Sequence, residues 1–147
     1  MTSEIVIRVA RPEEHARVAE TYAAWGYGGG VLPSDVVFVA EEDGALVGIV
    51  RRTVEEGVTM LRGMQVAPER RGRGIGARLL RAFVEDLDGA CTCIPYTHLT
   101  KFYGAEGFAV VADDDAPAFL QARLATYRAR GLSVLVMRRP AGAAPGA

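Results

Sequence analysis

Hydrophobic and polar positions along the chain follow two periods, which predict strands and helices in turn. The first segment, Ile5 to Arg8, alternates as a short strand does. A proline and two acids at positions 12–14 are typical of a first helical turn. The helical stripe that follows ends at Gly26, and its apolar members are Val18, Tyr22 and Trp25.

Three strands are predicted next, one directly after another. They span residues 36–41, 46–54 and 58–66. The segments between them, 42–44 and 55–57, end in glycine and have the composition of tight hairpin turns. We therefore expect an antiparallel arrangement of these strands.

The stretch from Met64 to Phe83 combines a strand end, a loop with three glycines and three arginines, and an amphipathic helix. Pro68 ends the strand, and the helix is expected to run to about Asp86. Its apolar positions fall on one stripe, formed by Ile75, Leu79, Leu80, Phe83 and Leu87.

The remaining segments continue the mixture of helices and strands. A short apolar strand is expected at 90–94, a short helix from Thr97 or Thr100, and a strand at 108–111. Asp113 to Asp115 are expected to cap a helix from Pro117 that Gly131 ends, before a last strand at 132–137. The order predicts an α+β (mixed α/β) fold in one domain, residues 1–139, with a disordered tail at 140–147.

Composition and charge describe an ordinary globular protein. The formal net charge is −1, which argues against an unspecific nucleic-acid partner although the segment 70–81 is locally basic. Residues 1–10 lack the apolar run of a secretory signal, and the other apolar runs are too short to cross a membrane. The sequence thus predicts a cytoplasmic protein with no membrane partner.

The two cysteines are expected to be buried, small, apolar residues. Cys91 and Cys93 would share one face of a strand, which is a poor geometry for a disulfide. Two cysteines make a zinc site only with histidines, and His15 and His98 are distant in sequence. No metal is predicted.

The glycines of the loop indicate an anion site. Gly72, Gly74 and Gly76 precede the helix, so backbone N–H groups would point outward at the positive end of the helix dipole. A P-loop needs Lys followed by Ser or Thr after the last glycine, but Ala77 and Arg78 stand there. A dinucleotide fingerprint fits the spacing only, since no acid ends the next strand.

Two motifs make the chain resemble the GCN5-related N-acetyltransferase (GNAT) superfamily. Residues 71–76 match its Q/R-x-x-G-x-G/A signature, and residues 101–108, Lys-Phe-Tyr-Gly-Ala-Glu-Gly-Phe, look like its second signature. The order of elements is also the family's, so the resemblance covers about residues 5–138. It implies a central mixed sheet of about seven strands with antiparallel N-terminal strands, a V-shaped splay and flanking helices.

The resemblance implies an acyl-CoA-dependent N-acyltransferase with acetyl-CoA as co-substrate. Tyr103 matches the family's general acid, and its ordinary pKa near 10 suits a proton donor. The backbone N–H of Val66 corresponds to the oxyanion donor. Arg70, Arg71 and Arg73 either contact the 3′-phosphate or remain solvated, and contact is expected for at least one of them. The implied cofactor-binding residues are Met64, Gln65, Val66, Arg71, Gly72, Arg73, Gly74, Ile75, Gly76 and Ala77.

The general base and the acceptor stay open. Met60 stands where some family members carry a glutamate, and His98 is a weak candidate for the base beside a water relay or a purely structural role. The aromatic residues Tyr22, Trp25 and Tyr27 either line an acceptor pocket or end a core stripe.

The predicted partner is a primary amine on a small molecule or a protein terminus, attacked directly in a ternary complex. The alternatives are a catalytically silent CoA-binding module and a transferase for another acyl group, such as succinyl. The sequence does not fix the oligomeric state, for which a homodimer is one option.

Overall fold

The chain forms two compact units, with the boundary between Asp86 and Leu87. The computed structural model describes residues 4–143. Within this range the first unit holds four strands and the second holds three. The tail predicted at 140–147 lies partly outside the described residues; residues 140–143 form a turn in which Ala143 N–H donates to the Pro140 carbonyl at 3.2 Å.

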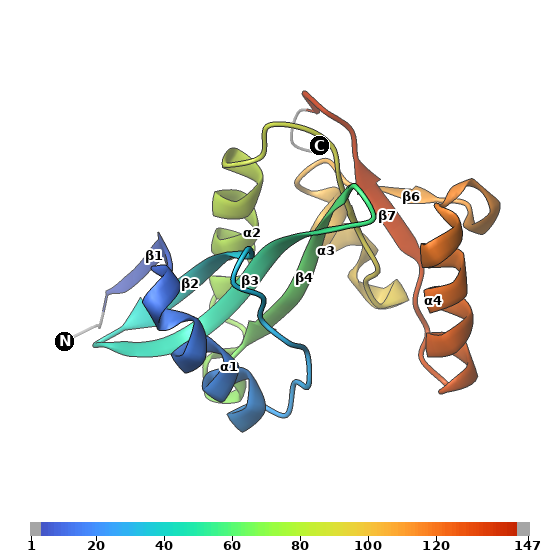
Figure 1. Ribbon diagram of the computed structural model, residues 1–147. Coiled ribbons are helices and arrows are strands. Elements are labelled where there is room, and N and C mark those ends of the chain that lie inside the picture. Colours follow the sequence, from blue (N-terminus) through green and yellow to red (C-terminus); the bar gives the residue numbers. More distant parts are fainter. Residues whose placement is uncertain (1–3, 144–147) are drawn as a thin grey trace. The chain divides into compact units, whose positions relative to one another are not determined.

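The four strands of the first unit form an antiparallel sheet in chain order (Figure 1). Both predicted hairpins are confirmed, since each turn has two successive residues at positive φ, as tight two-residue hairpin turns require. These pairs are Asp43 with Gly44 and Glu56 with Gly57. The strands are β1 (Ile5–Val9), β2 (Val36–Glu42), β3 (Ala45–Glu55) and β4 (Val58–Val66).

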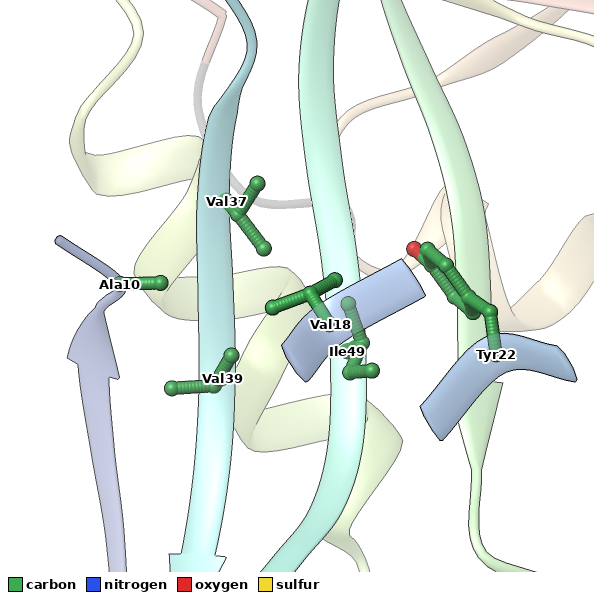
Figure 2. Close-up of a cluster of buried hydrophobic side chains, with 6 residues drawn as sticks. All are labelled: Ala10, Val18, Tyr22, Val37, Val39 and Ile49. Atoms are coloured by element: carbon green, nitrogen blue, oxygen red, sulfur yellow. The ribbon is translucent and has the colours of Figure 1, made fainter. Parts of the chain in front are cut away.

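Helices cover both faces of this sheet. Val37 and Val39 of β2 pack with Val18 and Tyr22 of α1 (His15–Ala24), as Figure 2 shows. The residue between them, Phe38, points the other way and lies 5.6 Å from the Phe83 ring of α2 (Ile75–Glu85). The 3₁₀ turns η1 (Pro12–Glu14) and η2 (Pro68–Arg70) precede the two helices.

Helix α2 lies very close to strand β3. A Cβ atom built on Gly48 would stand 2.7 Å from a methyl carbon of Leu79 and 2.9 Å from one of Ile75, so a side chain there would force these groups to shift. The predicted stripe is confirmed at four of its five positions, which are all buried: Ile75, Leu79, Leu80 and Phe83. The fifth, Leu87, lies beyond the end of α2 and is only partly buried. This packing fixes the first turn of α2 against the sheet.

The second unit contains three antiparallel strands in the order β5-β7-β6, with two helices. Its buried side chains include Phe108, Leu120, Leu124, Val136 and Met137. In chain order its elements are β5 (Cys91–Cys93), η3 (Thr97–Leu99), α3 (Thr100–Gly104), β6 (Ala109–Val111), η4 (Asp113–Asp115), α4 (Ala118–Ala129) and β7 (Val136–Arg139).

Two local predictions for this unit are wrong. The last strand is β7, four residues later than the predicted start, because residues 132–135 join the sheet only through an isolated bridge between Val134 and Tyr96. The acids at 113–115 do not cap α4, since Pro117 occupies the N-cap position and no side chain caps it. The Asp113 carboxylate instead forms an ion pair with Arg128.

Among residues 4–143, no helix combines the length and the hydrophobicity needed to cross a bilayer.

A partly buried carboxylate, that of Glu14, joins β1 to the start of α1. The two guanidinium nitrogens Nη1 and Nη2 of Arg8 each donate to one oxygen of Glu14 at 2.8 Å, and Arg11 N–H donates to the same carboxylate at 2.7 Å. The hydrogen bonds from Arg8, with that from Arg11, lower the pKa of Glu14 to about 2. The charged form of Glu14 is therefore the form that the fold stabilises.

This lowered pKa predicts an acid-sensitive contribution to stability. Glu14 is ionised in both states above its ordinary pKa of 4.5, where its bonds contribute in full, and the contribution is lost as the pH falls toward about 2. Urea unfolding should show that Glu14→Gln lowers the unfolding free energy at pH 7 far more than at about pH 2.5. Glu13→Gln, at an exposed pair, is the control. An equal loss at both pH values would contradict the prediction.

Candidate active site

The glycine loop between β4 and α2 has the backbone conformation expected of an anion site. Gly72 and Gly74 lie at φ of +81° and +78°, in the left-handed region that residues with a Cβ rarely adopt. A Cβ built on either glycine would meet no heavy atom within 4 Å. The outer side of the loop is therefore open, and a ligand can approach the backbone directly.

The loop ends at a helix N-terminus that no side chain caps. Gly74 is the N-cap residue of α2, and the first hydrogen bond of the helix runs from Arg78 N–H to its carbonyl at 3.1 Å. The N–H groups of the first turn, in residues 75–77, precede that bond and have no acceptor inside the helix. Together with the helix dipole they suit a phosphate or pyrophosphate group.

The three arginines of the loop have different surroundings. Arg70 donates from Nε to a carboxylate oxygen of Glu42, which is mostly buried, and this bond raises the pKa of Arg70. Arg70 thus braces η2 against the end of β2. Arg71 and Arg73 are exposed, and no ion pair holds either of them within residues 4–143. These two remain available to an anionic ligand.

Strand β4 is distorted just before the segment predicted to hold the co-substrate. Gly63 lies at φ +67°, and the β3–β4 register shifts so that Ile49 faces Gln65 while Arg51 faces Arg62. This is a β-bulge, which bends a strand and redirects the residues after it. Met64, Gln65 and Val66, which follow the bulge, are partly exposed.

In the second unit, the predicted acid and the weak base candidate have different surroundings. Tyr103 is 5% exposed, and its ring packs edge to face on Phe102 and Phe108 at 4.9 and 5.8 Å. His98 is exposed and its ring stacks on Tyr96 at 5.8 Å, so it is not a core residue. The roles of both side chains stay predictions.

The cysteines are buried free thiols, as expected. Cys93 is 2% exposed, and burial raises its pKa well above the ordinary value, with a further contribution from Cys91. A thiol held in its protonated form is a poor nucleophile. Among residues 4–143, no group of three or more His, Cys, Asp or Glu side chains could hold a metal ion.

The aromatic residues after α1 belong largely to the core of the first unit. Tyr22 is fully buried, and its hydroxyl donates to the Gly63 carbonyl at 2.7 Å. Burial raises the pKa of Tyr22, so the hydroxyl stays a donor. Trp25 and Tyr27 are partly buried and pack against the same cluster. Of the two alternatives, an acceptor pocket or a core stripe, Tyr22 therefore fits the core stripe.

Sequence reasoning missed a buried ion pair beside these rings. Arg51 donates from Nε to Asp35 at 3.2 Å, and their side chains are 5% and 1% exposed. The available signal was a charge within the apolar strand β3 and an acid directly before β2. Such charges are seldom buried unless they are paired.

A family comparison agrees with this architecture. The model of the acetyltransferase (GNAT) domain matches residues 33–110, more than half of the chain, and includes β2 to β4, the glycine loop, α2 and Tyr103. No curated protein matches the chain. The chain belongs to the GNAT acetyltransferase family.

Solved structures share the fold at low sequence identity. N-acetylglutamate synthase from Neisseria gonorrhoeae, complexed with coenzyme A and N-acetyl-glutamate, is 17% identical with a TM-score of 0.66; the match covers 96% of this chain but only 36% of that protein. The chain thus spans about a third of that protein's length.

Two structures of similar length also match. A GNAT-family acetyltransferase from Streptococcus pneumoniae is 15% identical, with coverage of 95% and 100% and a TM-score of 0.64. The protein yncA from Salmonella typhimurium, with its cofactor acetyl-CoA, is 18% identical, with 99% of each chain covered and a TM-score of 0.63. The predicted mixed α/β class and family are confirmed.

Because both cysteines are buried, the folded protein should react slowly with thiol reagents. Cys91 and Cys93 should react with a chromogenic disulfide reagent far more slowly in the folded chain than in guanidinium, because burial hides both and keeps Cys93 protonated. Absorbance of the released thiolate follows the reaction, and the unfolded chain gives the value for two thiols. Rapid modification of the folded chain would contradict this assignment.

Proposed function

We propose that the chain is an acyl-CoA-dependent N-acyltransferase that moves the acetyl group of acetyl-CoA to a primary amine. The observation that carries the proposal is the open glycine loop at the uncapped N-terminus of α2. Family membership and the relatives solved with coenzyme A or acetyl-CoA support it. The cytoplasmic location stays a prediction of the sequence.

In this proposal the loop binds the pyrophosphate of the co-substrate. N–H groups between Gly72 and Ala77 donate to its oxygens, at the end of α2 where a negative charge is favoured. Arg71 and Arg73 are free to contact the 3′-phosphate, whereas Arg70 is engaged with Glu42. The partly exposed segment Met64 to Val66 pairs with the extended arm of the co-substrate.

The proposed chemistry is direct acyl transfer in a ternary complex. The amine attacks the thioester carbonyl, the new C–N bond forms, and the C–S bond breaks. The Val66 N–H stabilises the oxyanion, and the Tyr103 hydroxyl gives its proton to the leaving thiolate. The amine loses a proton to a base that we leave unassigned. A covalent acyl-enzyme is disfavoured because Cys93 is buried as a thiol.

The acceptor is proposed to be a primary amine on a small molecule, with a protein terminus as the second option. The relative solved with N-acetyl-glutamate supports the small-molecule class. Calorimetry with acetyl-CoA and CoA, followed by thiol release against an amine panel, tests the whole proposal. Tight binding without turnover on any amine would favour the silent CoA-binding module, and no binding would remove the loop from the site.

A charge placed in the loop should abolish co-substrate binding. Gly74→Asp points a carboxylate into the open space where the pyrophosphate is proposed, so we expect the Kd for CoA to rise by tenfold or more, about 1.4 kcal/mol or more. Gly57→Asp is a matched control, because Gly57 has the same φ of +78° and the same open surroundings in a hairpin turn. It reproduces the backbone strain without the ligand. Calorimetry in which the two variants behave alike would refute the assignment.

Removing one hydroxyl should separate chemistry from binding. Tyr103→Phe keeps the ring packing with Phe102 and Phe108 but removes the proposed proton donor. We expect kcat to fall by about a hundredfold or more while the Kd for CoA stays nearly constant. Tyr127→Phe, at a partly buried position of α4 in the same unit, is the control. A wild-type kcat for Tyr103→Phe would reduce Tyr103 to a packing role.

A further inference from the structure

The buried pair of Asp35 and Arg51 is incompletely bonded. One oxygen of Asp35, Oδ2, accepts from Arg51 Nε at 3.2 Å and from Leu32 N–H at 2.9 Å. The other oxygen, Oδ1, and the guanidinium nitrogen Nη1 of Arg51 are buried without a hydrogen-bond partner among residues 4–143. A buried polar group left unpaired destabilises the fold. The pair therefore keeps one spare donor and one spare acceptor at a price in stability.

The spare donor of Arg51 lies beside the bulge of β4. A Cβ built on Gly63 would stand 2.7 Å from Arg51 Nη1 and 2.4 Å from the Tyr22 hydroxyl. The Tyr22 hydroxyl donates its proton to the Gly63 carbonyl, and it forms no hydrogen bond with Arg51 Nη1. Gly63 directly precedes Met64, the start of the segment assigned to the co-substrate. Arg51 Nη1 is thus directed at the backbone that leads into the proposed site of transfer.

Tyr27 is the more exposed of the two aromatic rings that cover the Asp35–Arg51 pair. Arg51 Cζ lies 5.8 Å from the ring centre of Tyr22 and 6.0 Å from that of Tyr27, and the two rings are 4.6 Å apart. Tyr22 is fully buried, whereas Tyr27 is partly exposed. Tyr27 sits on the chain between Gly26, at φ +78°, and a run of three glycines. Glycine permits many backbone conformations, so this segment can rearrange more readily than the helix that carries Tyr22.

The two unpaired atoms match a ligand that carries a carboxylate and an amine. A carboxylate accepts from a guanidinium N–H in a charge-assisted bond, and an amine donates to a carboxylate oxygen. A ligand with only a carboxylate would place a second negative charge beside Asp35 and leave Oδ1 unpaired. An amino acid carries both of the groups that these atoms require.

We propose that the acceptor is a free amino acid, whose carboxylate binds Arg51 Nη1 and whose amine is held by Asp35 Oδ1 before transfer, once the ring of Tyr27 has moved. This inference rests on the proposed N-acyltransferase function and names its substrate class. Arg51 and Asp35 are substrate-binding residues in it, and Tyr27 covers the site.

The first test compares acids with their amides. Initial rates of thiol release from acetyl-CoA are measured with the common L-amino acids, each paired with its carboxamide. The carboxamide keeps the amine and the side chain but removes the negative charge. We expect kcat/KM for the preferred acid to exceed that of its amide by about ten- to a hundredfold, as a hydrogen bond to a charged group provides. Equal rates, or faster amides, would overturn the inference and leave a buried water as the partner of Arg51.

The second test removes both charges together. Asp35→Leu with Arg51→Met avoids the unpaired charge that either single change would leave, so the fold should persist. The preference for acids should vanish while the Kd for CoA is unchanged. Arg52→Met with Asp86→Leu is the control, since it removes the neighbouring exposed pair on the opposite face of β3. A double variant at 35 and 51 that keeps the preference would also overturn the inference.

A variant of Tyr27 gives an independent test in case the double variant does not fold. Tyr27→Ala leaves the Asp35–Arg51 pair in place and opens the path to it. We expect KM to fall for the preferred acid, because its carboxylate and its amine reach the pair without displacing a ring. An unchanged or higher KM for that acid would contradict the role of Tyr27 as a cover.

Fluorescence separates failure of this inference from failure of the proposed function. Trp25 is the only tryptophan, two residues from Tyr27, so its emission reports the opening of this segment without any turnover. Each acid and its amide are titrated into the CoA-bound chain. A response to acids alone, with no turnover on any amine, would support the binding of an amino acid at this site and refute the transferase. Turnover only on amines without a carboxylate would support the transferase and overturn the amino-acid inference. Acids that give neither turnover nor a fluorescence response would also overturn the inference.

Discussion

The close packing of α2 against β3 is the constraint on which the rest of the proposed co-substrate site depends. Because Gly48 has no side chain, Leu79 and Ile75 approach the strand closely and hold the first turn of the helix in place. The loop before it has no comparable packing, since Gly72 and Gly74 face open space. A rigid helix end and an open loop are both required if backbone N–H groups are to bind an anion without first being ordered.

The Arg70–Glu42 pair adds a second anchor to the same loop. It ties η2, which precedes the glycines, to the end of β2. The loop is thus held at both ends, by an ion pair before it and by helix packing after it. The loop backbone is therefore restricted even though its glycines are conformationally permissive. A binding site made of main-chain N–H donors needs this pre-ordering.

Much of the fold could be predicted because its signals are local. The α2 stripe, the two hairpin turns and the glycine loop each depend on residues close together in sequence. The failures involve distant partners: Asp113 pairs with Arg128 rather than capping α4, and β7 begins late because Val134 bridges to Tyr96. The Asp35–Arg51 pair was invisible for the same reason. Strand β3 carries two adjacent arginines, and the sequence does not show which acid each of them will contact.

The hydrogen bond from Tyr22 to Gly63 has a consequence for how this chain can diverge. It fastens the bulge of β4 to a helix 41 residues earlier, while the neighbouring cover, from Gly26 onward, is built mostly of open glycine positions. Gly28 and Gly30 can take side chains without disturbing that bond. In the proposed function, a new preference for the acceptor can therefore arise by substitutions in this one surface segment, while the proposed co-substrate loop stays unchanged.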